Sequence, residues 1–284
     1  MEAQLSPATV RQMRLILFGA AVVGVLTGVS TFLLHITHDP LADVHAYWDA
    51  GARLNAGQPL YPVGADTNAP DFYRYPPLLA IAFRPLALVP FPLAAALWET
   101  LVLASFAFTV WRLGRRESTW IALGILATPI VWSLLIGQAQ VPVTALLLVG
   151  APWAVALATH LKLLPALVAL YWLGRRDWPT LGRFVTWTVA FGLLQLILEP
   201  DGTIAFLSFP SLGQVGDVIN FSPYVISPVL WAGLVVFGMG LTLYLAPTRW
   251  GWPAAVALSV LATPRLLTYQ LMTLLAGLRS PDRQ

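Results

Sequence analysis

Asp43 is the first residue of this chain whose type and position could do chemistry. It lies in "ADVHAYWDAGARLNAGQPLYP" (residues 42–62), directly after the first long apolar run, together with His45, Tyr47, Trp48 and Asp49. A carboxylate can accept a proton in a reaction, and the other side chains are types that bind sugars and phosphates. A solvated loop is the alternative. Residues 43, 47 and 53 do not share one helical face, so only part of this cluster can point into one cavity.

Lys162 is the second candidate, because it is the only lysine and lies in the apolar stretch "HLKLLPAL" beside His160. Charges within membrane segments are costly and tend to serve a cavity or pathway. A lysine there can bind phosphate as a point charge, whereas the alternative is that it extends to the interface. Arg265, in the proline-containing "TPR", is a second candidate phosphate ligand, and Glu99 is expected to pair with an arginine.

Several other chemistries are disfavoured. The chain has no cysteine, which excludes disulfides and thiolate metal sites. "HITH" places His35 and His38 three residues apart without an evident third ligand, so no metal is expected. Motifs of phosphate-binding loops, dinucleotide sites and metalloproteases do not occur. The net charge of +3 comes from arginines clustered in short segments, which indicates membrane topology rather than nucleic-acid binding.

The elements that position these residues must be membrane helices. Hydrophobic residues make up 58% of the chain and charged residues 10%, whereas soluble domains average about 25% charged residues. We therefore predict one integral-membrane, all-α domain over residues 1–284, with about eight to ten transmembrane or broken helices. An uncleaved first helix is expected at 15–36, an outer loop at 37–76, and the remaining helices within 77–278. The apolar runs that could cross lie at 15–36, 91–111, 120–136, 141–173, 184–198, 225–246 and 253–278.

Two of these runs do not fit simple spans. Residues 141–173 must return once across the membrane but contain Pro142, Pro152 and Pro165, and residues 253–278 contain "TPR". A broken or re-entrant arrangement that lines a cavity is expected for both, and a proline-kinked helix is the alternative.

Arginines give the orientation. The rule that positive loops are cytoplasmic places the N-terminus inside, because short segments between the apolar runs carry arginines: Arg11 and Arg14, then Arg112, Arg115 and Arg116, then Arg175, Arg176 and Arg183, and Arg249. The polar stretches 37–76 and 199–224 and the "GQAQ" turn would face outward. We expect a multi-pass protein of the inner (plasma) membrane with its active site on the outer side.

Six motifs follow one another along the chain: the Asp43 stretch, "FYRYPPLLAIAFRPLALVP", "IGQAQVPVTALLL", "HLKLLPAL" closed by "GRRDW", then "NFSP" and "TPRLLTYQL". Together and in this order, they make the sequence resemble glycosyltransferase family 87 of the GT-C superfamily. Each motif alone is weak, and the order and spacing of the set carry the resemblance, which covers most of the chain.

This resemblance implies a GT-C-like helical bundle and a glycosyltransferase that uses a polyprenyl-phosphate sugar, mannose- or arabinose-like, without a cofactor. Its partners would be that donor, a lipid or glycan acceptor and membrane lipids, but no nucleic acid. Asp43 would be the base of an inverting transfer. The expected donor-binding residues are Lys162, Arg265, Tyr47, Arg74, Tyr75, Gln138, Asn220 and His160. The alternatives are a transporter or flippase of lipid-linked sugars and a homologue that has lost catalysis.

Overall fold

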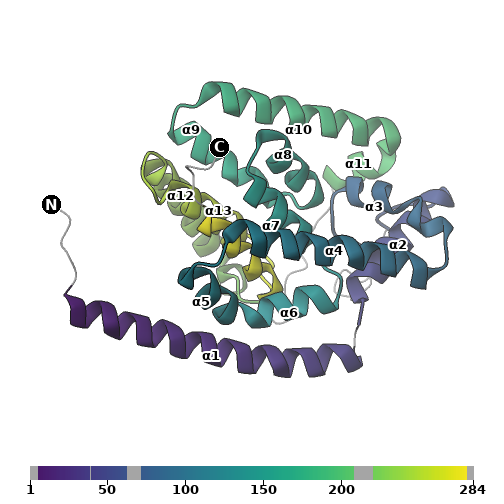
Figure 1. Ribbon diagram of the computed structural model, residues 1–284. Helices are drawn as coiled ribbons and strands as arrows, with labels where there is room; N and C mark the ends of the chain where they lie inside the picture. Colours follow the sequence, from purple (N-terminus) through teal and green to yellow (C-terminus); the bar gives the residue numbers. More distant parts are fainter. Residues whose placement is uncertain (1–5, 39, 63–71, 208–219, 280–284) are drawn as a thin grey trace.

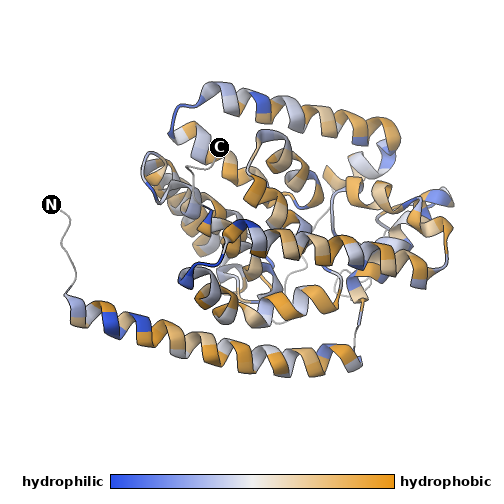
Figure 2. Ribbon diagram, viewed as in Figure 1, coloured by the Kyte–Doolittle hydropathy of each residue, from blue (hydrophilic) through white to orange (hydrophobic). Residues whose placement is uncertain are grey.

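The computed structural model describes residues 6–38, 40–62, 72–207 and 220–279, and within these ranges the chain is helical without a strand. The membrane-scale helices are α1 (Pro7–His38), α4 (Phe91–Leu113), α10 (Trp178–Leu198) and α12 (Pro228–Leu245). Each is long and apolar enough to cross a bilayer, so the chain is an all-α, polytopic membrane protein. Figure 1 shows α1 along one side of the bundle and α10 along the opposite side, and Figure 2 shows how apolar residues dominate the long helices.

The first helix is longer than predicted and is held by small residues. Only Ala21, Gly24, Gly28 and His35 are buried in α1. A Cβ atom on Gly24 would come within 2.2 Å of the main-chain oxygen of Gly124, so the two backbones are in direct contact. Such contacts are typical of membrane helices, which cannot use the hydrophobic effect to associate within lipid.

The run at 120–136, predicted to cross the membrane once, is not one straight helix. It forms α5 (Glu117–Ile125) and α6 (Ala127–Leu135), which meet at an angle of 65°. Both helices pack on α1, where the Thr27 and Thr128 hydroxyl oxygens lie 2.7 Å apart. The bend turns the end of α6 toward the start of α2 (Ala42–Asn55), a helix within the stretch expected to be an outer loop.

The run at 141–173 is broken, as predicted. It contains α7 (Gln140–Val149), α8 (Pro152–Leu161), the 3₁₀ helix η2 (Leu164–Val168) and α9 (Ala169–Gly174). Pro152 and Pro165 lie in the first turns of α8 and η2, where the missing N–H has no intrahelical partner to lose. Almost every side chain of α7 is buried, and this helix packs against α4, α8 and η4 at the centre of the bundle.

The C-terminal run is also broken, between α13 (Gly251–Leu261) and the 3₁₀ helix η4 (Thr268–Leu278). Backbone groups freed at the break need partners. The Asn220 side chain supplies two hydrogen-bond partners. Its Nδ2 donates to the Pro264 oxygen at 3.0 Å, and its Oδ1 accepts from the Leu266 N–H at 2.9 Å. The Phe221 N–H donates to the Leu266 oxygen at 2.9 Å.

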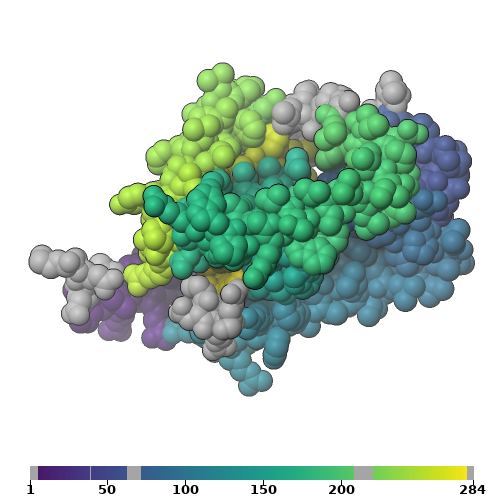
Figure 3. All heavy atoms as spheres, turned by 90° about the horizontal axis from the view of Figure 1, so that it is seen from above, coloured from purple at the N-terminus to yellow at the C-terminus, as the bar shows by residue number. Residues whose placement is uncertain are grey.

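Short helices complete the bundle: α3 (Pro77–Phe83), η1 (Leu86–Leu88), α11 (Pro200–Leu207) and η3 (Pro223–Val225). In Figure 3, yellow atoms of the C-terminal segment are visible between yellow-green α12 and green α11. The two broken stretches and the start of α2 thus come together inside a frame of longer helices.

Candidate functional site

The first turn of α2 places Asp43 against the end of α6. The Leu41 and Asp43 N–H groups donate to the Leu135 and Ile136 oxygens at 2.9 and 3.1 Å. These bonds join N–H groups that lack partners at a helix N-terminus to carbonyl groups that lack partners at a helix C-terminus. The partial positive charge of a helix N-terminus also favours a carboxylate in the first turn. The backbone therefore fixes where Asp43 leaves the helix.

The turn after α6 fixes the Asp43 carboxylate. Gly137 adopts φ = 69°, and its oxygen accepts a hydrogen bond from the Trp98 indole at 2.7 Å. The next residue, Gln138, is fully buried and donates from Nε2 to Oδ2 of Asp43 at 2.9 Å. Its Oε1 accepts from the Tyr47 and Tyr75 hydroxyls at 2.9 and 3.0 Å. The two tyrosines thus set the orientation of the amide that holds the carboxylate.

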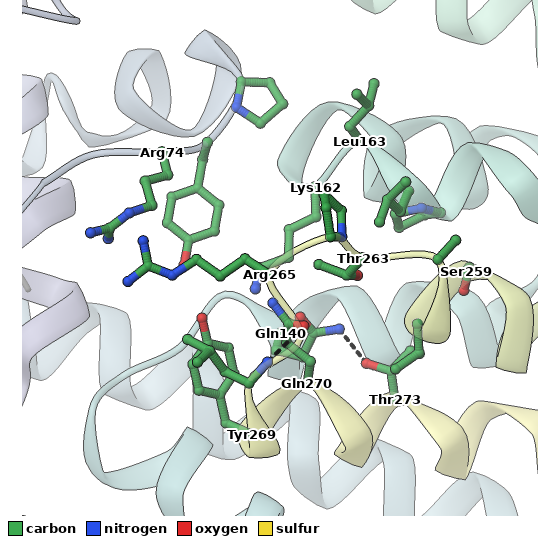
Figure 4. A pocket seen from close by; sticks show the side chains of 18 of the residues that line it. Arg74, Gln140, Lys162, Leu163, Ser259, Thr263, Arg265, Tyr269, Gln270 and Thr273 are labelled. Carbon is green, nitrogen blue, oxygen red and sulfur yellow. Dashed lines mark hydrogen bonds between the residues drawn. The ribbon is translucent and has the colours of Figure 1, made fainter. Parts of the chain in front are cut away.

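Asp43 lines a pocket of about 350 Å³ together with Lys162. The Lys162 ammonium lies 5.0 Å from the ring centre of Tyr75 and 5.2 Å from that of Tyr269, so two aromatic faces stabilise the cation. Arg74 and Arg265 line the same pocket, and Figure 4 shows both reaching toward it beside Lys162. One carboxylate and three cations therefore share this cavity.

Lys162 lies between α8 and η2, outside the candidate spans. Burial lowers its pKa to about 7, although the neighbouring Asp43 carboxylate favours the charged form and opposes the shift. An anionic ligand in the pocket would restore the ammonium by the same attraction.

The remaining lining is neutral. Polar groups come from α7, α13, η4 and the break between α13 and η4, and apolar side chains come from η2, α11 and α12. The polar members are Gln140, Ser259, Thr263, Gln270 and Thr273, and the apolar members include Leu163, Leu164, Pro165, Phe206 and Trp231. Figure 4 shows the guanidinium groups of Arg74 and Arg265 on the left, Lys162 near the centre above Gln140 and Gln270, and Ser259 and Thr273 on the right. No spacing in the sequence pointed to Thr273 or Ser259, because η4 meets α7, and α13 meets η4 and η2, only in the folded chain.

The structure brings together Asp43, Arg74, Tyr75, Lys162 and Arg265, but not every residue expected to meet the donor. Tyr47 and Gln138 are fully buried behind Asp43. His160 contacts α10, where its Nε2 lies 2.9 Å from the Thr188 oxygen, and Asn220 holds the break described above. These four are not among the residues that line the pocket.

Three further features bear on the site. Tyr73 is fully buried, and Trp48 donates to the Val89 oxygen at 3.3 Å, so neither offers its ring to the pocket. Glu99 makes no ion pair with an arginine among the described residues; its Oε1 is buried without a hydrogen bond beside Gly137. Within the same ranges, no three His, Cys, Asp or Glu side chains come together in a way that could hold a metal ion.

The apolar spans define a multi-pass membrane protein, and the charges that line its pocket suit an anionic ligand. Residues 72–278 match the model of glycosyltransferase family 87, and since this is more than half of the chain, the chain belongs to that family. It is a membrane glycosyltransferase. The match begins after Asp43, so it does not include the carboxylate.

Curated relatives give a finer comparison. A polyprenol-phosphate-mannose-dependent alpha-(1-2)-phosphatidylinositol pentamannoside mannosyltransferase of Mycolicibacterium smegmatis is 28% identical over 276 residues, covering 86% of this chain and 67% of the relative. The Mycobacterium tuberculosis enzyme of the same description is 29% identical over 204 residues, covering 62% of this chain and 46% of the relative. A phosphatidylinositol mannoside mannosyltransferase of M. smegmatis is 32% identical over 199 residues, covering 58% of this chain and 45% of the relative. No solved structure gives a significant match.

Proposed function

We propose that this protein transfers a mannose- or arabinose-like sugar from a polyprenyl-phosphate donor to a lipid or glycan acceptor at the outer face of the membrane. The observation that carries the proposal is one cavity lined by Asp43, Lys162, Arg74 and Arg265. A carboxylate beside cations is what a transfer from a lipid phosphate requires. The names of the relatives support a polyprenyl-phosphate-mannose donor and a lipid acceptor.

The proposed reaction is a single displacement with inversion. The acceptor hydroxyl oxygen attacks the anomeric carbon, the bond from that carbon to the phosphate oxygen breaks, and polyprenyl phosphate leaves with the electron pair. Asp43 takes the hydroxyl proton. Gln138 donates to Oδ2 at 2.9 Å and the Tyr75 hydroxyl lies 3.4 Å from Oδ1, so the carboxylate is oriented at the wall of the pocket for this role.

The cations act on the leaving group. Negative charge grows on the phosphate as the sugar–phosphate bond breaks, and fixed positive groups stabilise this charge most in a site with little water. Lys162 supplies a compact charge held between two rings, and Arg74 and Arg265 can each bind phosphate oxygens through two N–H groups.

The arrangement of the spans supports an outer site and a cytoplasmic N-terminus. Helix α4 begins beside α2, where Phe91 stacks on His45. Its last turn carries Arg112, which is close enough to Arg279 for the two charges to interact. At the start of α1, Arg14 pairs with Glu117 at 2.5 Å. In both α1 and α4, the arginines are therefore near the end opposite to the end that meets α2, the helix that carries Asp43. The positive-inside rule requires this arrangement of an outer site.

The decisive test uses purified protein in liposomes with a labelled polyprenyl-phosphate sugar and lipid acceptors. Wild type should form product, and Asp43→Asn should lower turnover about 10²- to 10⁴-fold while donor affinity changes little, because an amide cannot take the proton. The control is Asp49→Asn on the same helix, since Asp49 does not line the pocket.

Other results would contradict the proposal. If Asp43→Asn turned over at the wild-type rate, Asp43 would not be the base. If wild type bound the donor but formed no product, the non-catalytic homologue would be favoured. Movement of the intact donor across the liposome membrane, without transfer, would indicate a flippase.

A further inference from the structure

The neutral half of the pocket contains two amides that are each held at one end. Gln140 comes from α7 and Gln270 from η4, and both line the pocket. The Gln140 Nε2 donates to Thr273 Oγ1, and the Gln270 Oε1 accepts from the Leu267 N–H at 3.3 Å. The other ends, Gln140 Oε1 and Gln270 Nε2, make no hydrogen bond with the described residues.

A closed circuit fixes the orientation of Gln140. The Thr144 hydroxyl donates to the main-chain oxygen of Gln140 at 2.8 Å, which uses its one proton. It must therefore accept from Thr273, whose hydroxyl lies 2.8 Å away, and Thr273 must in turn accept from Gln140 Nε2. The orientation of Gln270 is fixed more simply, because only its carbonyl oxygen can accept from the Leu267 N–H. Gln140 thus offers an acceptor to the pocket and Gln270 offers a donor.

A pair of this kind suits one class of ligand. Gln140 and Thr273 are 6% and 1% exposed, so a ligand that reaches them leaves bulk water, and groups buried without hydrogen bonds would be costly. A sugar hydroxyl both donates and accepts. A carboxylate or an ammonium would find no counter-charge on α7 or η4, because the lining residues that these two helices contribute are all uncharged.

We propose that Gln140 and Gln270, held by Thr273, Thr144 and the Leu267 N–H, bind hydroxyl groups of an uncharged donor sugar and select it. This inference rests on the proposed function, since it places the donor phosphate at Lys162 and the arginines. The sugar is joined to that phosphate through one oxygen, and the neutral half of the same cavity is the space next to the cations. Gln140 and Gln270 are positioning and specificity residues for the sugar, while Asp43 acts on the acceptor.

The test compares two phosphodiester lipids of the same charge, one with and one without the sugar: the polyprenyl-phosphate sugar and polyprenyl methyl phosphate, the sugar-free lipid. We expect wild type to bind the sugar-bearing lipid more tightly. Thr273→Val and Gln140→Met keep the side-chain volume nearly constant but remove the hydroxyl and the amide. Each should weaken binding of the sugar-bearing lipid about tenfold and change binding of the sugar-free lipid less than about twofold.

Two controls sharpen the comparison. Thr159→Val removes an equally buried hydroxyl that lies outside the pocket and bonds only to its own helix, so it should change neither affinity. Lys162→Ala should weaken binding of both lipids alike, because both carry a phosphodiester of the same charge. Thermal unfolding of each variant in detergent checks that the fold is kept.

The inference would be overturned by equal losses for both lipids in Thr273→Val and Gln140→Met, or by no loss in either. It would also be overturned if only the KM for the acceptor rose, because the neutral half would then hold the acceptor. Failure of the proposed function is read separately, from absence of product with wild type, whereas failure here is read from the difference between the two lipids.

Discussion

The two halves of the pocket obtain their order in different ways. In the charged half, Asp43 is oriented by Gln138, which Tyr47 and Tyr75 hold from behind, and Lys162 lies between two aromatic rings. In the neutral half, the side chains that meet the pocket orient one another through the circuit of Gln140, Thr273 and Thr144. The charged half therefore depends in part on Gln138 and Tyr47, which do not line the pocket, and the neutral half depends mainly on its own lining.

This difference has a physical reason. A carboxylate and an ammonium in one small cavity attract each other, and without rigid support they would form a pair that blocks the site. Hydrogen bonds from a buried amide hold the carboxylate in place, and aromatic faces stabilise the ammonium without neutralising it. Neutral amides and hydroxyls can satisfy one another, so they need no such support.

The largest effect should follow from disturbing the support of the charged half at Gly137. A Cβ atom there would come within 2.1 Å of the Val44 side chain and 2.5 Å of Glu99 Oε1, at φ = 69°. We expect Gly137→Ala to lower the free energy of unfolding by about 1–3 kcal/mol and to reduce transfer more than tenfold, because Gln138 moves with the turn.

Thermal unfolding and turnover measure this effect. The matched control is Gly182→Ala in α10, where a Cβ atom would meet nothing within 4 Å. That change should be neutral or stabilise by up to about 1 kcal/mol, since alanine favours a helix. Equal stability and turnover in both variants would show that the charged half does not need this turn.

An intermediate effect is expected from Gln138→Leu, which keeps the buried volume but removes the amide. We expect turnover to fall about tenfold to a hundredfold while donor affinity stays the same, because Asp43 loses its hydrogen bond and two tyrosine hydroxyls lose their acceptor. Steady-state turnover and direct donor binding separate the two quantities. A parallel loss of donor affinity would mean that Gln138 supports the whole pocket rather than the carboxylate.

The smallest effect near neutral pH should be the pH dependence of donor binding. The protonated form of Lys162 binds the phosphate, and its pKa in the empty site is about 7, so affinity should be greatest below pH 7 and fall as pH rises. The slope should approach about a factor of ten per pH unit above 7.

Lys162→Arg tests this assignment, because a guanidinium stays charged throughout the range. The variant should bind the donor with little change between pH 6 and 9. Binding by wild type that is equally independent of pH would remove Lys162 from the phosphate site. Neither protein should show this dependence through the neutral half, which has no titratable side chain among its described lining residues.

Sequence alone determined the membrane character and the all-helical class, and it predicted the breaks in the runs at 141–173 and 253–278 but not the break between α5 and α6. The low charge content excludes a soluble fold of this size, and Pro152, Pro165 and "TPR" lie where the backbone must start a new helix or leave one. The family was predicted from ordered motifs, and the family match confirmed it. Asp43 and Lys162 stood out because isolated charges are rare in such a chain, although their roles remain proposals.

Only the tertiary structure decided which polar residues share one cavity. Periodicity could not show that α6 bends away from α5 and meets the start of α2, because that bend depends on packing against α1. Nor could it show that Tyr47 lies behind Gln138, or that Gln140 meets Thr273 across 133 positions of the chain. A linear sequence fixes each segment's preference for lipid or water, whereas the partner of each buried amide is set by how the segments pack together.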